Sequence, residues 1–141
     1  MPEIVTRQFG KIGFEEDAVL QFPSGLPGFE NRTRFLLVER APLMFLQNLD
    51  SPELCFFALP VEAVQPDYQL EMTPDDQQTL SLTAPPLTLA ILSANQSGAW
   101  TANLLAPVVI NKEARRAVQA VRADSRYSHK HPLPTGDASC S

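Results

Sequence analysis

The sequence has 141 residues, of which 44% are hydrophobic and 19% are charged, and its 11 Lys and Arg against 16 Asp and Glu give a net charge of −5. A chain of this length and composition is expected to form one compact domain with a hydrophobic core. The acidity argues against direct binding to nucleic acid or to an anionic membrane, because both attractions depend on positive charge.

The charge is unevenly distributed along the chain. Residues 1 to 111 contain 5 basic and 13 acidic side chains, a net charge of −8. Residues 112 to 141 contain 6 basic and 3 acidic side chains, a net charge of +3. A partner would therefore meet two parts of opposite charge, and the larger, acidic part favours a basic partner.

Short apolar runs recur along the chain, separated by proline, glycine or clusters of Asp, Asn and Ser. Their length and the turn residues between them predict the strands of an all-β sandwich or barrel. The 13 prolines are hard to place in a helical bundle. The apolar runs are Ala18 to Phe22, Phe35 to Val38, Met44 to Leu49, Cys55 to Val61, Leu87 to Leu92 and Leu104 to Ile110.

A first helical signal lies at residues 73 to 78. Thr73 is a suitable N-cap, and Pro74 suits the first helical position, where no backbone N–H is needed. We therefore predict one short helical turn over Asp75 to Gln78.

A second helical signal lies near the C-terminal end. Ala114, Ala117, Val118 and Val121 have the i, i+3, i+4, i+7 spacing of a helix face, and Asn111 is a suitable N-cap. This periodicity predicts a helix over residues 112 to 123. A strand is the alternative, although the alternation of residues 118 to 123 is weaker.

The remaining features concern compartment and termini. Cys55 lies in an apolar run and Cys140 is next to the last residue, which favours a buried thiol and a loose tail thiol over a disulfide. The N-terminus resembles no signal peptide, and no apolar stretch is long enough to span a bilayer, so we expect a cytoplasmic protein. Residues 134–141 are small and polar and are expected to form a disordered tail after a domain of residues 1–133.

Sequence patterns of enzymes are scarce. There is no Gly-rich phosphate loop and no Gly-x-Ser-x-Gly elbow. His129 and His131 would share one face of a strand, but a metal needs further ligands and only Asp124 lies nearby. We predict no catalytic residue, no metal and no cofactor, and keep a small metal-dependent enzyme as an alternative.

A polar loop between two apolar runs carries Gln47, Asn48 and Asp50. One interpretation is a hairpin whose turn residues serve the geometry of the turn. The other is a loop that a rigid scaffold presents to a partner.

Taken together, these stretches resemble the flagellar assembly factor FliW family. The similar segments occur in the order of the family and cover residues 3 to 133. They are residues 9 to 12, 22 to 30, 34 to 37, 45 to 61 with the core Leu-Gln-Asn-Leu-Asp-Ser-Pro, 66 to 68, 102 to 111 and 127 to 133.

The resemblance implies a mainly β fold, a single-domain, barrel-like antiparallel sheet with one or two short helical turns and no enzymatic activity. Members of the family bind CsrA, a small basic RNA-binding dimer, and stop it allosterically from repressing translation of flagellin mRNA. They also bind flagellin, which sequesters them and so releases CsrA. A stand-alone flagellin chaperone without a CsrA role is the alternative.

The resemblance also favours a helical turn at residues 112 to 116 followed by a strand near 117 to 122. It suggests contact residues on probable loops and edges. The candidates for partner binding are Gln47, Asn48 and Asp50 in the polar loop and Asp67, Tyr68 and Glu71 after Pro66. The acidic side chains would steer encounter with a basic partner and repel RNA phosphates.

Overall fold

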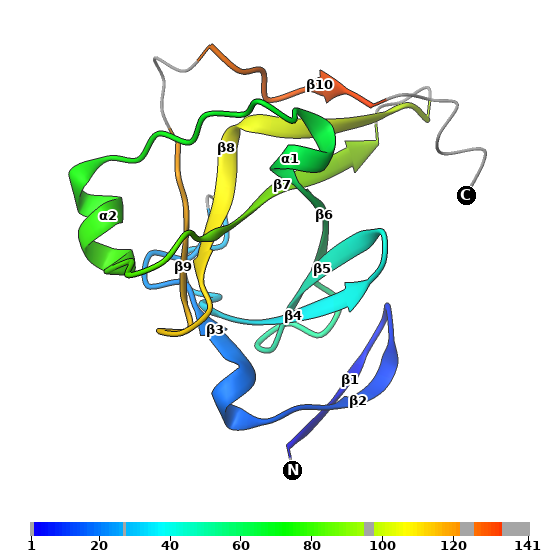
Figure 1. Ribbon diagram of the computed structural model, residues 1–141. Helices are drawn as coiled ribbons and strands as arrows, with labels where there is room; N and C mark the ends of the chain where they lie inside the picture. Colours follow the sequence, from blue (N-terminus) through cyan, green and yellow to red (C-terminus); the bar gives the residue numbers. More distant parts are fainter. Residues whose placement is uncertain (1, 27, 95–97, 122–125, 134–141) are drawn as a thin grey trace.

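The computed structural model describes residues 2–26, 28–94, 98–121 and 126–133. Strands are the main regular elements, with short helical segments between them (Figure 1). The predicted tail 134–141, Cys140 and Asp124 lie outside the described residues. The elements are β1 (Glu3–Thr6), β2 (Gly10–Gly13), the 3-10 turn η1 (Glu16–Ala18), β3 (Val19–Gln21), β4 (Arg34–Arg40), β5 (Leu43–Asn48), β6 (Cys55–Pro60), α1 (Val61–Val64), α2 (Pro74–Leu80), β7 (Leu87–Ala94), β8 (Trp100–Asn111), β9 (Arg116–Gln119) and β10 (His131–Pro132).

The main sheet closes on itself. Strands β3 to β8 follow one another as antiparallel neighbours, and β9 pairs with both β8 and β3. The contact between β3 and β9 is parallel and its register joins one residue pair, Gln21 and Arg116. β10 adds to the outside of β8, and β1 and β2 form a separate hairpin. The predicted mainly β, barrel-like fold is confirmed.

The inside of the barrel is filled by apolar side chains from the predicted runs. Phe22, Phe35, Leu46, Leu89 and Ile110 belong to this inner core, and each is at most 4% exposed. Phe22 and Phe35 pack ring against ring with centroids 4.8 Å apart. The alternation of strands places these residues on one face of the sheet, so that burial of this face closes the barrel.

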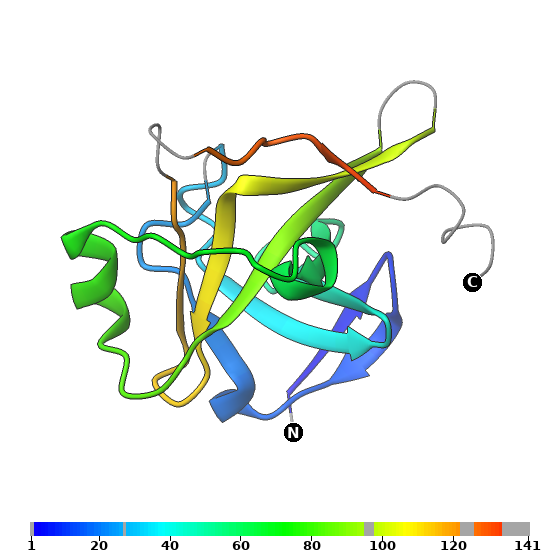
Figure 2. The same ribbon diagram turned by 45° about the horizontal axis from the view of Figure 1, so that its top comes forward.

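The outer face of the sheet is covered in three places. The β1–β2 hairpin places Phe9 and Ile12 against a cluster that includes Phe45. α1 covers Ala90, Ala102 and Leu104 through Val61, and α2 covers Val109, Val118 and Ala120 through Leu80. Figure 2 shows the hairpin and the two helices on the outside of the barrel. Several strands are therefore buried on both faces and read as continuous apolar runs.

The first predicted helical turn is confirmed. α2 begins with Pro74, and the Thr73 hydroxyl accepts a hydrogen bond from the Asp76 backbone N–H at 3.1 Å. The C-terminal residue of the helix, Leu80, is fully buried.

The helix predicted by periodicity over residues 112 to 123 is wrong. The Asn111 side chain accepts hydrogen bonds from the backbone N–H groups of Glu113 and Ala114, which begins a turn. Arg115 then adopts a left-handed conformation with φ of 58°, which ends the turn, and β9 starts at Arg116. A turn followed by a strand is thus observed, although the strand covers residues 116 to 119 rather than 117 to 122.

The misleading spacing arises because β9 is buried on both faces. Ala117 points into the inner core, whereas Val118 packs under α2. The other two members of the expected stripe, Ala114 and Val121, are exposed. Two neighbouring apolar residues on opposite faces of a strand imitate the i+3, i+4 step of a helix.

We predict that Arg115→Gly leaves the free energy of unfolding unchanged or raises it by up to about 1 kcal/mol. A left-handed conformation costs an L residue about 1–2 kcal/mol, which offsets the entropy that glycine gains in the unfolded chain. The matched change Arg116→Gly, in a strand, should lower the free energy of unfolding by about 1 kcal/mol. Urea unfolding curves measure both, and an equal loss in the two variants would contradict the argument.

Gly25 fixes the bend that places Leu26 and Phe29. Its φ is +65°, and a Cβ atom there would lie 2.5 Å from the Glu30 Cα and 2.6 Å from the Glu30 carbonyl oxygen. Gly28 also has a positive φ, +87°, but a Cβ atom there would meet nothing within 4 Å. The two glycines therefore differ in the space around them and not in the sign of φ.

We predict that Gly25→Ala destabilises the fold by about 2 kcal/mol more than Gly28→Ala, because only the first adds a backbone clash to the cost of a left-handed alanine. Thermal or urea unfolding of the two variants gives the difference. Similar losses would show that the close approach of Gly25 to Glu30 is not maintained in solution.

Candidate partner-binding surfaces

Strand β8 turns a corner between its pairing with β9 and its pairing with β10 (Figure 1). Its register against β7 shifts between Leu89 and Ile91, so that residues 104 to 107 of β8 lie opposite Ala90. We call residues 104–107 the β8 corner. A bulge of this kind removes ladder partners from several backbone groups, which must then find others.

Side chains and neighbouring segments supply those partners. The Leu104 N–H donates to the Ser128 carbonyl at 3.0 Å, and the Leu104 carbonyl accepts from the Tyr68 hydroxyl at 2.7 Å. The Ala106 N–H donates to Asn103 Oδ1 at 3.0 Å, and the Ala106 carbonyl accepts from Gln119 Nε2 at 2.9 Å. Three other segments of the chain, which contain Tyr68, Gln119 and Ser128, are thus connected to β8 at one corner.

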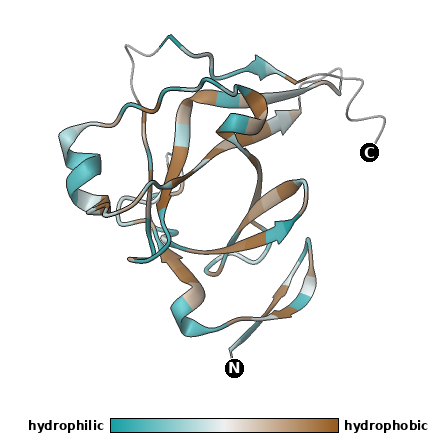
Figure 3. Cartoon of the chain, in the orientation of Figure 1, coloured by the Kyte–Doolittle hydropathy of each residue, from teal (hydrophilic) through white to brown (hydrophobic). Residues whose placement is uncertain are grey.

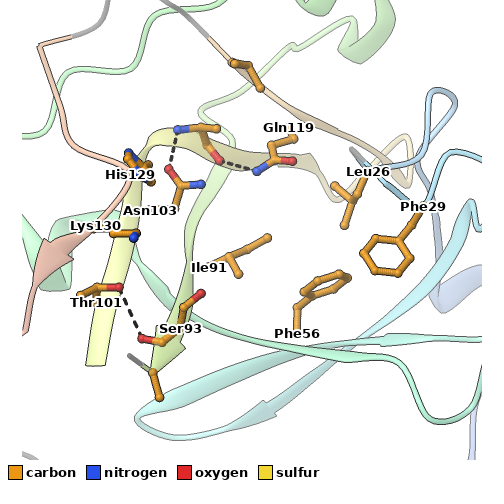
Figure 4. A pocket seen from close by; sticks show the side chains of 13 residues that line it. Leu26, Phe29, Phe56, Ile91, Ser93, Thr101, Asn103, Gln119, His129 and Lys130 are labelled. Carbon is orange, nitrogen blue, oxygen red and sulfur yellow. Dashed lines mark hydrogen bonds between the residues drawn. The ribbon is translucent and has the colours of Figure 1, made fainter. Parts of the chain in front are cut away.

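A pocket of about 630 Å³ opens beside the β8 corner (Figure 4). One wall is apolar and is continuous with the inner core through Phe56 and Ile91. The opposite wall is polar and carries the basic side chain of Lys130. The apolar wall consists of Leu26, Phe29, Phe56 and Ile91, and the polar wall contains Ser93, Thr101, Asn103, Gln119, His129 and Lys130.

The polar loop predicted between β5 and β6 is a turn held from within. Gln47 and Asn48 are fully buried. Gln47 Nε2 donates to the carbonyls of Asn48, Pro52 and Leu54 at 3.0 to 3.2 Å. Asn48 Oδ1 accepts from the backbone N–H groups of Asp50 and Ser51 at 2.8 and 2.7 Å. Both amides thus serve the geometry of the turn, which agrees with the first of the two interpretations. Their burial speaks against Gln47 and Asn48 as contact residues on a loop or edge.

Asp50, by contrast, is exposed at the same turn. Its carboxylate accepts hydrogen bonds from the Arg34 guanidinium, with Nη2 at 2.9 Å. Next to it, Arg32 Nε donates to the Ser51 hydroxyl at 2.6 Å. An ion pair this accessible contributes little stability, so Asp50 remains available to a partner.

Asp67 and Glu71 lie on the outer surface between α1 and α2. Residues 61–80, which we call the acidic segment, contain five carboxylates and no basic residue. Asp67 and Glu71 are both exposed. The hydrogen bond from the Gln65 amide lowers the pKa of Asp67 below its ordinary value. Figure 3 shows α2 as hydrophilic beside the hydrophobic strands that it covers.

Tyr68 belongs to the acidic segment and connects it to distant parts of the chain. Its ring stacks on Tyr127 with centroids 4.3 Å apart, and its hydroxyl donates to the Leu104 carbonyl in the β8 corner. Burial raises the pKa of Tyr68 to about 12. The Tyr127 oxygen accepts hydrogen bonds from the Gln69 N–H at 2.9 Å and from Arg126 at 3.1 Å. The tyrosine pair thus fastens the acidic segment to residues 126–128.

The two histidines belong to no candidate metal cluster among the residues that the structure describes. Within the described residues there is no group of three or more His, Cys, Asp or Glu side chains that could hold a metal ion. His129 lines the pocket, and His131 lies in β10, where it pairs with Ala102 of β8. Cys55 is half-buried, and this burial raises the pKa of its thiol to about 11, so the thiol is protonated at neutral pH.

The pocket was not found by sequence reasoning because its walls come from separate parts of the chain. Leu26 and Phe29 belong to the first bend, Phe56 to β6, and Lys130 to the segment before β10. The acidic segment did carry a signal, since its charge of −5 over twenty residues equals the net charge of the whole chain. Among the helices of the described residues, none has the length and apolar character needed to cross a membrane.

Comparison with known proteins gives a consistent result. The family model "FliW protein" matches residues 3–133. A flagellar assembly factor FliW from Syntrophomonas wolfei subsp. wolfei is 34% identical over 137 residues, covering 93% of this chain and 88% of the relative. One from Treponema pallidum is 33% identical over 136 residues, covering 93% and 91%.

A solved structure agrees with these sequence matches. A crystal structure of the flagellar assembly factor FliW superposes with a TM-score of 0.85 at 29% identity, covering 94% of this chain and 98% of that one. The structural match thus spans nearly the whole of both chains. The chain therefore belongs to the FliW family of flagellar assembly factors.

Proposed function

We propose that this protein is a non-enzymatic, cytoplasmic regulator that binds CsrA and relieves its repression of flagellin mRNA translation, and that flagellin sequesters it in turn. Membership of the FliW family supports a role in flagellar assembly. The finer assignment to these two partners is our inference. The observation that carries it is the acidic segment, a surface suited to a basic protein.

The acidic segment suits CsrA for reasons of charge and access. Glu62, Asp67, Glu71 and Asp75 are exposed, and Asp76 is partly exposed. Their carboxylates lie on an outer surface of the barrel and face solvent rather than the core. A negative surface accelerates encounter with a basic dimer and disfavours RNA phosphates near the complex.

Charge reversal of this surface should slow association. In the Asp67→Lys, Glu71→Lys variant we expect the association rate with CsrA to fall about tenfold at low salt and to depend less on ionic strength. Both residues are exposed, so the fold should be unaffected. Stopped-flow or surface plasmon resonance at several salt concentrations measures the rate.

A matched control is available at the other side of the molecule. Glu15 and Asp17 are exposed at η1, below the barrel in the view of Figure 1. Glu15→Lys with Asp17→Lys changes the net charge by the same amount. Equal slowing in both double variants would assign the effect to net charge and would remove the acidic segment from the interface.

Recovery of partners separates the proposed function from its nearest alternative. Purified protein incubated with CsrA and flagellin should bind each of them, and added flagellin should displace CsrA. Binding to flagellin alone would instead identify a stand-alone flagellin chaperone. If the protein does not bind CsrA at any salt concentration when flagellin is absent, the regulatory role is contradicted.

A further inference from the structure

The pocket beside the β8 corner has a chemistry opposite to that of the acidic segment. Thirteen of the described residues line it and none of these thirteen is acidic, although acidic residues outnumber basic ones in the chain. Lys130 and His129 are exposed at its polar wall. Figure 4 shows these two side chains on one side of the pocket and Leu26, Phe29 and Phe56 on the other.

Two amides of the pocket keep one unused polar group each. Asn103 uses Oδ1 to accept from the Ala106 N–H, and Gln119 uses Nε2 to donate to the Ala106 carbonyl. Asn103 Nδ2 and Gln119 Oε1 have no partner among the described residues. In Figure 4 the Asn103 nitrogen is turned toward the pocket, and the Gln119 oxygen points toward Leu26.

These two groups are fixed before any ligand arrives. Both amides are oriented by the backbone of a single residue, Ala106, in the β8 corner. They offer one donor and one acceptor, which is what the C=O and N–H groups of an extended peptide require. A helix would not use them, because its own backbone groups are already paired.

We propose that this pocket binds an extended peptide segment that carries an apolar side chain next to a carboxylate. The apolar side chain fills the wall of Phe29, Phe56 and Ile91, and the carboxylate lies toward Lys130. The peptide backbone pairs with Asn103 Nδ2 and Gln119 Oε1. This inference deepens the proposed function, because it rests on the protein acting by binding other proteins.

Charge complementarity selects this occupant. A basic segment would meet Lys130 and His129, and the described part of the lining holds no carboxylate to balance its charge. The pocket volume of about 630 Å³ suits a few side chains. The acidic segment and the pocket thus have opposite preferences, and a basic dimer that suits the first does not suit the second.

Titration with model peptides tests the proposal directly. The probes are blocked hexapeptides in which Leu alternates with Glu, and the same peptides with Lys in place of Glu. With protein labelled with ¹⁵N, the Glu peptide should shift the side-chain amide signals of Asn103 and Gln119, and the Lys peptide should bind about tenfold more weakly. No shift, shifts confined to other residues, or equal binding of both peptides would overturn the proposal.

Variants identify the groups involved. Asn103→Asp keeps an oxygen for the Ala106 N–H but replaces the unused donor with an acceptor, and Lys130→Glu reverses the charge at the rim. Each should weaken binding of the Glu peptide about tenfold. The control Arg7→Glu makes the same charge change at an exposed residue of the β1–β2 hairpin and should leave binding unchanged.

Failure of this inference can be distinguished from failure of the proposed function on which it rests. The peptide experiment uses neither CsrA nor flagellin, so a failed partner assay and a failed peptide titration are separate results. Unfolding midpoints of the variants show whether the fold is retained. Unaltered peptide binding in both folded pocket variants would reject the assignment of Asn103 and Lys130, even if the partner assay succeeds.

Discussion

The corner of strand β8 is the constraint on which the rest of the structure depends. One strand has to pair with β9 at one end and with β10 at the other, and it must change direction between them. The change of direction removes the ladder partners of Leu104 and Ala106, and a buried unpaired backbone group costs about 1–3 kcal/mol. Tyr68, Ser128, Asn103 and Gln119 lie where they do because they supply the missing partners.

Burial of both faces of the sheet explains how the acidic surface arises. The inner face needs no cover beyond the closed barrel, but the outer face has apolar residues that need the hairpin, α1 and α2. The helices that cover the sheet carry Glu62, Asp75 and Asp76, and the segment that joins the helices carries Asp67 and Glu71. The acidic surface is therefore a consequence of covering β7, β8 and β9, and it is held on a rigid support.

Sequence reasoning succeeded where one local rule decides the structure. Thr73 and Pro74 predicted the start of α2 because capping involves residues that are neighbours in the chain. It failed at β9, where tertiary burial of Ala117 and Val118 on opposite faces overrides the helical spacing.

At Gln47 and Asn48 the sequence left two interpretations open, and the structure agrees with the turn whose residues serve its own geometry. Polarity alone does not distinguish a side chain that faces solvent from one that pairs the backbone of a buried turn. The pocket could not be predicted, because it depends on which distant segments meet at the β8 corner. The family resemblance supplied the fold, but not the position of any binding surface.

The β8 corner also bears on how two partners could compete. The acidic segment is attached to it through the Tyr68 hydroxyl at Leu104, and the pocket through Asn103 and Gln119 at Ala106, two residues further along the strand. A ligand transmits a conformational change only when the element between two sites has two arrangements of similar free energy. Here the connecting backbone groups are paired on both sides, so a second arrangement would break several hydrogen bonds at once. If two partners bind at these two surfaces as proposed, this geometry favours competition through their size and charge over a change of shape in this protein.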